Sequence, residues 1–230
     1  MQNYLLFIDT EASGAPANWN TPFFKEEEWP HIVQIAWIVY DKAKHEIKAA
    51  NYYICDNDFQ IEPAAYKIHG LTKSFLAENG ERRKEVIKQL SQDLKKYKPL
   101  VIGHFLELDT ALINVEYYRT GQKNQLKELP VFCTMQATKH LSRNLKQKYL
   151  SLNELYQFLF SKNFEGQHNA LADAQATAEC FFKLLEKGLI NETELYQKKN
   201  VIEKRTEVNI WYYLIPLFIL LSALIIYYFL

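Results

Sequence analysis

Apolar residues fall along this chain in short runs that alternate with longer amphipathic segments. Continuous apolar, β-branched or aromatic runs of this length predict buried strands. We expect strands over residues 4–9, 31–41, 47–55, 99–104 and 129–134. The first three follow one another at hairpin distance, so they predict an antiparallel meander at the start of a sheet.

Helical spacing dominates the intervening segments. We expect helices over residues 81–98, 109–121, 151–160 and 170–188. Ser151 and Glu154 have the spacing of a capping box at the start of the third of these. Three strands followed by alternating helices and strands predict an α/β domain, with a mixed five-stranded sheet flanked by helices.

Residues 210–230 break this pattern, because they form a run of 21 residues without one charge. As a helix the run would be about 31 Å long, close to the thickness of a bilayer core, and aromatic residues cluster at both ends. We expect one C-terminal transmembrane helix; a buried or dimerising helix is the alternative. The chain then divides into a domain over 1–188, a charged juxtamembrane linker over 189–209 and the helix over 210–230.

Charge and cysteine content bear mainly on location. The 27 basic and 27 acidic residues balance, so overall charge gives no support for a polyanionic partner. The three cysteines have no metal-binding spacing and fit a reducing compartment. The N-terminal residues lack the features of a signal peptide. Basic residues before residue 210 place the preceding domain on the cytoplasmic side of a single-pass protein. They are Lys198, Lys199, Lys204 and Arg205.

Acidic residues stand at the ends of several predicted elements. Asp9 and Glu11 leave the first strand and point to the same face, where two like charges repel unless a cation lies between them. Asp109 opens the helix after the fourth strand, and Asp173 lies in the first turn of the last helix. Either acid could simply stabilise a helix N-terminus. Together with Asp9 and Glu11, they favour a site for magnesium or manganese.

Three motifs follow one another along the chain: DTEASG (9–14), HFLELD (104–109) and HNALADA (168–174). In this order they resemble the DEDDh family of 3′–5′ exonucleases, which have a ribonuclease H-like fold and include proofreading subunits of bacterial polymerases. The resemblance covers residues 4 to about 187. Ala12 replaces a usual Thr, Phe105 replaces a usual Asn, and the segment 15–29 is longer than in minimal members.

The resemblance implies roles for these residues in hydrolysis with two Mg²⁺ or Mn²⁺ ions. Asp9 would bind both ions, Glu11 and Asp173 would complete one, Asp109 would hold the other, and His168 would be the general base. A capping or loop role is the alternative for His168. The substrate, a single-stranded DNA or RNA 3′ end, would contact Thr10, Ser13, His69, Gly70 and Leu71. For the last three, a helix-ending glycine beside a buried leucine is an equally good interpretation.

A basic run could follow the phosphates of the substrate, or could be a solvated surface. It consists of Lys139, His140, Arg143, Lys146 and Lys148. The sequence therefore predicts a membrane-anchored, metal-dependent 3′–5′ exonuclease that releases nucleoside 5′-monophosphates. An exoribonuclease of the oligoribonuclease type and a catalytically idle nucleic-acid-binding module on the membrane are the alternatives.

Overall fold

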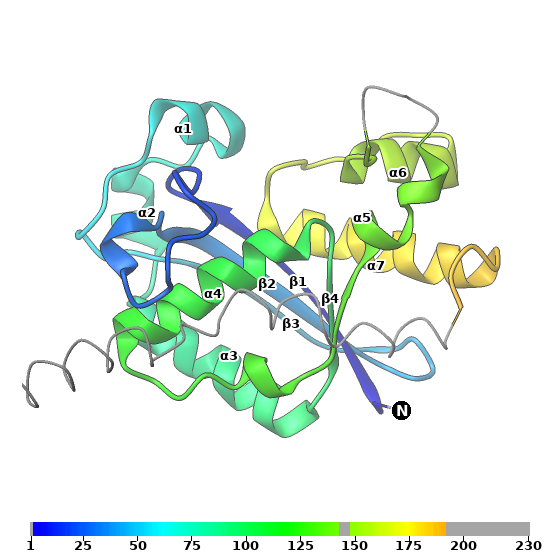
Figure 1. Cartoon of the computed structure of the whole chain (residues 1–230), viewed down its shortest axis with the longest axis horizontal. Helices are drawn as coiled ribbons and strands as arrows, with labels where there is room; N and C mark the ends of the chain where they lie inside the picture. The colour runs from blue at the N-terminus through cyan, green and yellow to red at the C-terminus, as the bar shows by residue number, and fades with distance from the viewer. Residues whose placement is uncertain (1, 143–147, 192–230) are drawn as a thin grey trace, which may run out of the picture. The chain divides into compact units, whose positions relative to one another are not determined.

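The computed structural model of the protein describes residues 2–142 and 148–191, and Figure 1 shows the chain. Five strands form one sheet in the order β3-β2-β1-β4-β5. The strands are β1 (Tyr4–Ala12), β2 (Ile32–Asp41), β3 (Glu46–Tyr53), β4 (Leu100–Gly103) and β5 (Val131–Cys133). β1, β2 and β3 form an antiparallel meander, whereas β4 runs parallel to β1 and β5 parallel to β4. The predicted mixed five-stranded sheet is confirmed.

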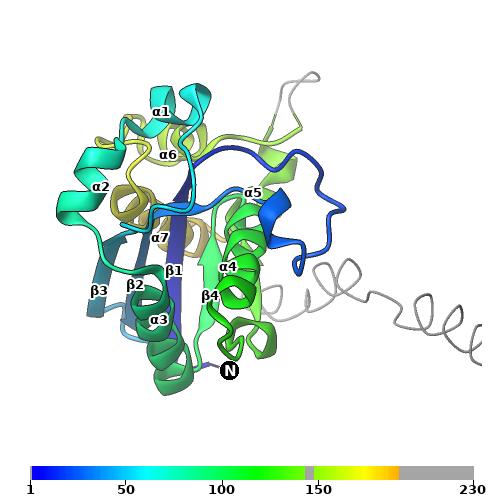
Figure 2. The same cartoon turned by 90° about the vertical axis from the view of Figure 1, so that its left-hand side faces the viewer.

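Helices cover both faces of this sheet (Figure 2). The α-helices are α1 (Pro63–His69), α2 (Lys73–Asn79), α3 (Arg83–Tyr97), α4 (Leu106–Thr120), α5 (Thr134–Ala137), α6 (Leu152–Phe160) and α7 (Ala170–Glu186). Short 3₁₀ helices are η1 (Glu26–Glu28), η2 (Leu126–Glu128) and η3 (Lys139–Leu141). α3 and α4 pack on one face, and α6 and α7 pack on the other.

Side chains of β1 alternate between the two faces, as a strand requires. Leu6 and Ile8 join the core under α3 and α4, while Phe7 joins the core under α6 and α7. By the same alternation, Asp9 and Glu11 face the side of α7, and Thr10 faces the side of α4. The strand therefore delivers polar groups to both layers at the end where its apolar run stops.

Most predicted elements agree with the structure to within a few residues, and the capping box of Ser151 and Glu154 is present. One helix start was predicted wrongly. α4 begins at Leu106 rather than at Asp109, because Phe105 takes a left-handed conformation (φ 61°) and ends the turn after β4. Asp109 consequently lies at the end of the first helical turn.

α1 and α2 were missed, since seven residues are too few to show a clear helical period. Pro63 at the start of α1 and Gly70 at its end (φ 70°) are signals that could have located that helix. In the part of the chain that the structure describes, no helix is long and apolar enough to span a bilayer. The predicted transmembrane helix over 210–230 lies outside the described residues, as does most of the linker over 189–209.

Candidate active site

β1 is longer than its neighbour β4, so the end of β1 has one edge that no strand covers. The pairing between β1 and β4 runs from Leu5–Leu100 to Phe7–Ile102 and then stops, whereas β1 continues to Ala12 against β2. Residues 9–12 therefore have a strand neighbour on one side. On the other side the chain leaves β4 through Gly103, where a Cβ atom would lie 3.2 Å from the carbonyl oxygen of Ile8.

Asp109 reaches this free edge of β1 from the first turn of α4. The hydroxyl of Thr10 donates a hydrogen bond of 2.7 Å to Asp109 Oδ1, and the backbone of Thr10 also bonds to this carboxylate. Both residues are buried, with 8% and 4% of their surfaces exposed. Thr10 thus holds a carboxylate in place, and its predicted contact with substrate stays a prediction.

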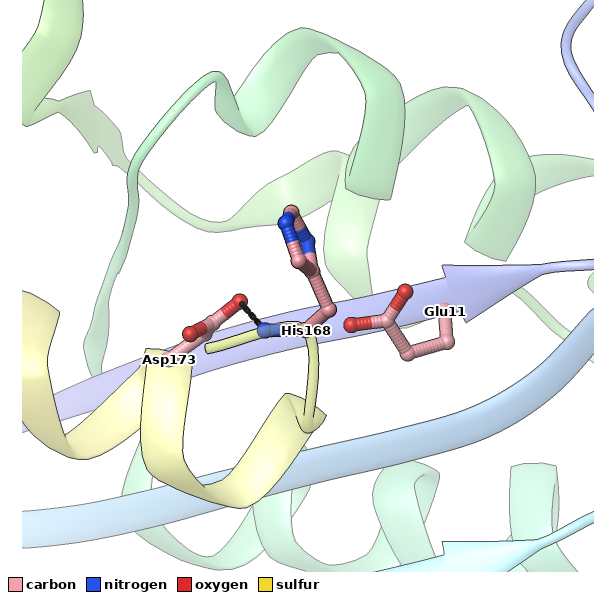
Figure 3. Close-up of side chains that lie close together, drawn as sticks. All are labelled: Glu11, His168 and Asp173. Carbon is pink, nitrogen blue, oxygen red and sulfur yellow. Dashed lines mark hydrogen bonds between the residues drawn. The ribbon is translucent and has the colours of Figure 1, made fainter. Parts of the chain in front are cut away.

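Glu11, His168 and Asp173 come together from β1 and from the start of α7 (Figure 3). One potential ligand atom of each residue lies within 4.8 Å of those of the other two. The carboxylates of Glu11 and Asp173 point toward each other in this view. The backbone N–H of His168 donates to Asp173 Oδ2 over 3.2 Å, and His168 itself has a left-handed backbone (φ 63°) with an exposed side chain.

Burial raises the pKa of every carboxyl group in the site, and the charges of neighbouring acids add to it for Asp9, Glu11 and Asp109. Burial, then the charges of Asp173 and Asp109, raise the pKa of Glu11 to about 8. Burial raises the pKa of Asp109 to about 7 against the opposing hydrogen bonds of Thr10, and that of Asp173 to about 6. The pKa of Asp9 is also raised well above its ordinary value, by burial and by the other three acids. The four predicted acids therefore lie close enough for the charges of Glu11, Asp109 and Asp173 to raise the pKa of Asp9.

These residues fit a divalent metal ion. Among the residues that the structure describes, Asp173 Oδ1 is a buried oxygen without a hydrogen-bond partner, and such an atom is costly to bury unless a ligand contacts it. The donor set is carboxylate oxygen with one imidazole, which suits Mg²⁺ or Mn²⁺. A cation would also remove the repulsion that raises the carboxyl pKa values.

Gln34 positions the start of α7, and the sequence analysis did not single it out. It lies on β2 opposite Glu11 and is 1% exposed. Its side-chain oxygen accepts a hydrogen bond from the N–H of Ala170, the first residue of α7, and its nitrogen donates to Asn51. A lone amide inside the otherwise apolar run 32–39 is the signal that could have found it.

α1 is tied to the end of β1, which brings the predicted substrate-binding residues next to the carboxylates. His69 Nδ1 accepts from the N–H of Leu71, so Nε2 carries the proton and donates to the carbonyl of Ala12 over 3.2 Å. Ser13 Oγ accepts from the N–H of His31 and is 4% exposed. Gly70 ends α1, as expected if this residue is a helix-ending glycine. A substrate role for these residues stays a prediction.

The long segment 15–29 folds against the start of α4. The rings of Trp19 and Phe105 lie 5.9 Å apart, and Trp19 packs edge-on against Trp29 at 6.4 Å. Trp29 is buried, Trp19 is half-buried, and Phe105 remains 37% exposed. The substitution of Phe for Asn at position 105 therefore places an accessible ring one helical turn before Asp109.

A buried ion-pair network holds the far end of this segment. Glu116 of α4 is 1% exposed and pairs with Arg119 and with Arg83 of α3, each at 2.8 Å. Arg119 in turn donates to the backbone carbonyls of Glu26, Trp29 and Pro30. The helix that carries Asp109 thus also fixes the segment 15–29.

The basic run is described only in part. Lys139 and His140 lie in η3 and are exposed, and Lys148 is exposed as well. Arg143 and Lys146 lie outside the described residues. Whether the run follows phosphates stays a prediction.

Comparison with known proteins places these observations in context. The family described as "Exonuclease" matches residues 6–181. The DNA polymerase III subunit epsilon of Aquifex aeolicus (strain VF5) is 40% identical over 88 residues, which are 38% of this chain and 41% of that protein.

The fold is similar to crystal structures of E. coli exonuclease I. The complex with a dA16 oligonucleotide has a TM-score of 0.65 at 18% identity, over 85% of this chain and 42% of that chain. The zinc-bound form of the complex with single-stranded DNA has a TM-score of 0.66 at 18% identity, with the same coverage. The present chain therefore spans less than half the length of these relatives.

Proposed function

This chain belongs to the exonuclease family, and on that premise we propose that it is a metal-dependent 3′–5′ exonuclease that acts on single-stranded DNA. The observation that carries the proposal is the convergence of Glu11, His168 and Asp173 beside the Thr10–Asp109 pair at the free edge of β1. The DNA substrate is supported by the relatives, a DNA polymerase subunit and an exonuclease that binds DNA oligonucleotides.

The carboxylates would hold two divalent ions, Mg²⁺ or Mn²⁺, with Asp9 shared between them. Glu11 and Asp173 would complete one ion and Asp109 the other. When bound, such ions supply an activated water and stabilise the negative charge that develops on the phosphate and on the leaving oxygen. Each turnover would release a nucleoside 5′-monophosphate.

His168 would take the proton from the attacking water. Its exposed imidazole lies in the cluster, and its backbone N–H is fixed by Asp173. Histidine is the side chain that most often serves as a general base. Gln34 would hold His168 and Asp173 in place relative to Glu11, because it joins the start of α7 to the strand beside Glu11.

A direct assay tests the proposal. The protein is incubated with 5′-labelled single-stranded DNA, duplex DNA and RNA, each with Mg²⁺, Mn²⁺ or chelator. We expect ladders that shorten from the 3′ end, fastest on single-stranded DNA, with mononucleotide products, no cleavage in chelator and none with Asp9→Ala. Undiminished activity in chelator, or internal cuts, would contradict the mechanism. Faster degradation of RNA than of single-stranded DNA would show that RNA is the preferred substrate.

We also propose that residues 210–230 anchor the protein in a membrane, with the exonuclease domain on the cytoplasmic side. The support is the sequence itself: an uncharged run of bilayer length, preceded by Lys198, Lys199, Lys204 and Arg205.

Fractionation of the full-length chain tests this anchor. We expect the protein in the membrane fraction after alkaline washing and in solution after addition of detergent. Leu220→Arg with Leu221→Arg should release it, because each arginine at the centre of a span costs about 2.5–3.5 kcal/mol; Leu220→Ile is the matched control. Full-length protein that stays in the supernatant without detergent would refute the anchor.

A further inference from the structure

An exposed aromatic ring, that of Phe105, lies at the start of the helix that carries Asp109. Phe105 immediately precedes α4, and Asp109 follows it by four residues, which is about one helical turn. The ring is 37% exposed although it also contacts Trp19 at 5.9 Å. One side of Phe105 is therefore supported by another aromatic residue, and part of its surface is open to solvent.

The backbone at this position disfavours phenylalanine. Phe105 has φ 61° and ψ 36°, in the left-handed region, where Asn is tolerated much better than a bulky side chain. Packing against Trp19 alone leaves more than a third of the side chain in water. A strained conformation that is retained beside a reactive site is a recognised mark of function.

The support behind the ring is fixed before any ligand arrives. Trp19 packs on the buried Trp29. The backbone carbonyl of Trp29 accepts a hydrogen bond of 2.7 Å from Arg119, whose guanidinium is held by Glu116. A binding surface organised in this way loses little conformational freedom when it captures a ligand.

We propose that Phe105, supported by Trp19, stacks against a nucleobase of the substrate strand close to the scissile phosphate. The proposal rests on the proposed function of the neighbouring carboxylates. Every base has an aromatic face, so such a contact grips a single strand without regard to its sequence.

The alternative is that Phe105 merely covers the aromatic cluster formed by Trp19 and Trp29. Stability separates the two interpretations. A covering role predicts that loss of the ring lowers the melting temperature and leaves DNA affinity intact. A stacking role predicts that Phe105→Asn keeps its melting temperature and loses DNA affinity. Asparagine suits the left-handed backbone but offers no large face to a base.

The test compares full-length Phe105→Asn, Phe105→Ala and Phe105→Tyr with the wild type. Tyr118→Ala is the matched control, since Tyr118 is a similarly exposed ring (45%) on the same helix, about 20 Å further along its axis. Affinity for 5′-labelled single-stranded DNA is measured by fluorescence anisotropy with Ca²⁺ in place of Mg²⁺, and kcat/KM with Mg²⁺. The oligonucleotides carry one abasic site at each of the last four positions in turn.

We expect Phe105→Asn and Phe105→Ala to weaken binding and kcat/KM by roughly ten-fold, with Phe105→Tyr and Tyr118→Ala within two-fold of the wild type. At one of the four positions, an abasic site should weaken DNA binding by the wild type about ten-fold as well. The same abasic site should weaken binding by Phe105→Ala little further, because that variant has already lost the stacking contact. Unchanged binding by Phe105→Ala, or equal sensitivity of both proteins to every abasic site, would overturn the stacking role. Because binding is measured without turnover, a wild type that binds DNA but does not cleave it would contradict the proposed function alone.

Discussion

Replacement of Glu11 by glutamine should stabilise the metal-free protein while it abolishes activity. Glu11 is 8% exposed, and burial, with the charges of Asp173 and Asp109, raises its pKa from 4.5 to about 8. Glutamine has almost the same shape and no charge. It therefore avoids the cost of burying this acid but cannot supply the anionic oxygen that a metal ion requires.

The size of the effect follows from proton linkage. Between pH 4.5 and 8 the folded protein keeps a proton on Glu11 that the unfolded chain releases, so the stability of the metal-free wild type falls as the pH rises through this window. Each pH unit contributes about 1.4 kcal/mol, which gives about 3 kcal/mol at pH 7 and less than 1 kcal/mol at pH 5. For a chain of this size, the gain at pH 7 corresponds to roughly 6–12 °C in Tm.

Thermal unfolding in chelator at pH 5, 6, 7 and 8 measures this gain. We expect the Tm difference between Glu11→Gln and the wild type to grow with pH, and to shrink when Mg²⁺ stabilises the wild type. Glu85→Gln, on the exposed surface of α3, should shift stability by less than about 0.5 kcal/mol at every pH. A Glu11→Gln protein that is less stable at pH 7, or shifted equally at pH 5 and pH 8, would refute the reasoning.

Three further variants test other parts of the site. His168→Ala should lower kcat by about 10²–10⁴-fold with Mn²⁺ affinity retained in calorimetry; an unchanged rate across neutral pH would exclude the general-base role. Gln34→Leu should leave the N–H of Ala170 unpaired, destabilise the fold by about 1–3 kcal/mol in urea and lower kcat more than it raises KM. Arg119→Met should cost about 3–5 kcal/mol, because Glu116 loses one of its two charged partners in a buried site; a loss below 1 kcal/mol would show that Arg83 suffices.

The sheet and most of its helices could be predicted because their signals are local. The apolar runs of β1 and β2, the capping box of α6 and the alanine-rich α7 are each visible within about 10–17 residues. The spacing of Asp9 and Glu11 likewise indicates a shared face without any tertiary information. The structure then adds that Asp173 and His168 meet Glu11, which the family resemblance implied and the spacing alone could not.

Features that depend on tertiary pairing could not be predicted. The capping of α7 by Gln34 joins residues 136 positions apart, and the bond from Thr10 to Asp109 joins residues 99 positions apart. Nothing in the sequence near Trp19 indicates that it packs against Phe105. The start of α4 was missed because a left-handed phenylalanine is rare, so the motif's acid was mistaken for the first residue of the helix.

The unequal lengths of β1 and β4 also have a consequence for local motion. The part of β1 between Leu5 and Phe7 is held by strands on both sides, whereas its last residues have a strand on one side. Opening of the tip therefore breaks fewer backbone bonds than opening of the sheet centre. Amide hydrogen exchange should be slow at Phe7 and faster at Glu11, and slower at Glu11 once a cation joins β1 to α4 and α7. The strand that carries the ligands would then report its own occupancy through the exchange rate of its backbone.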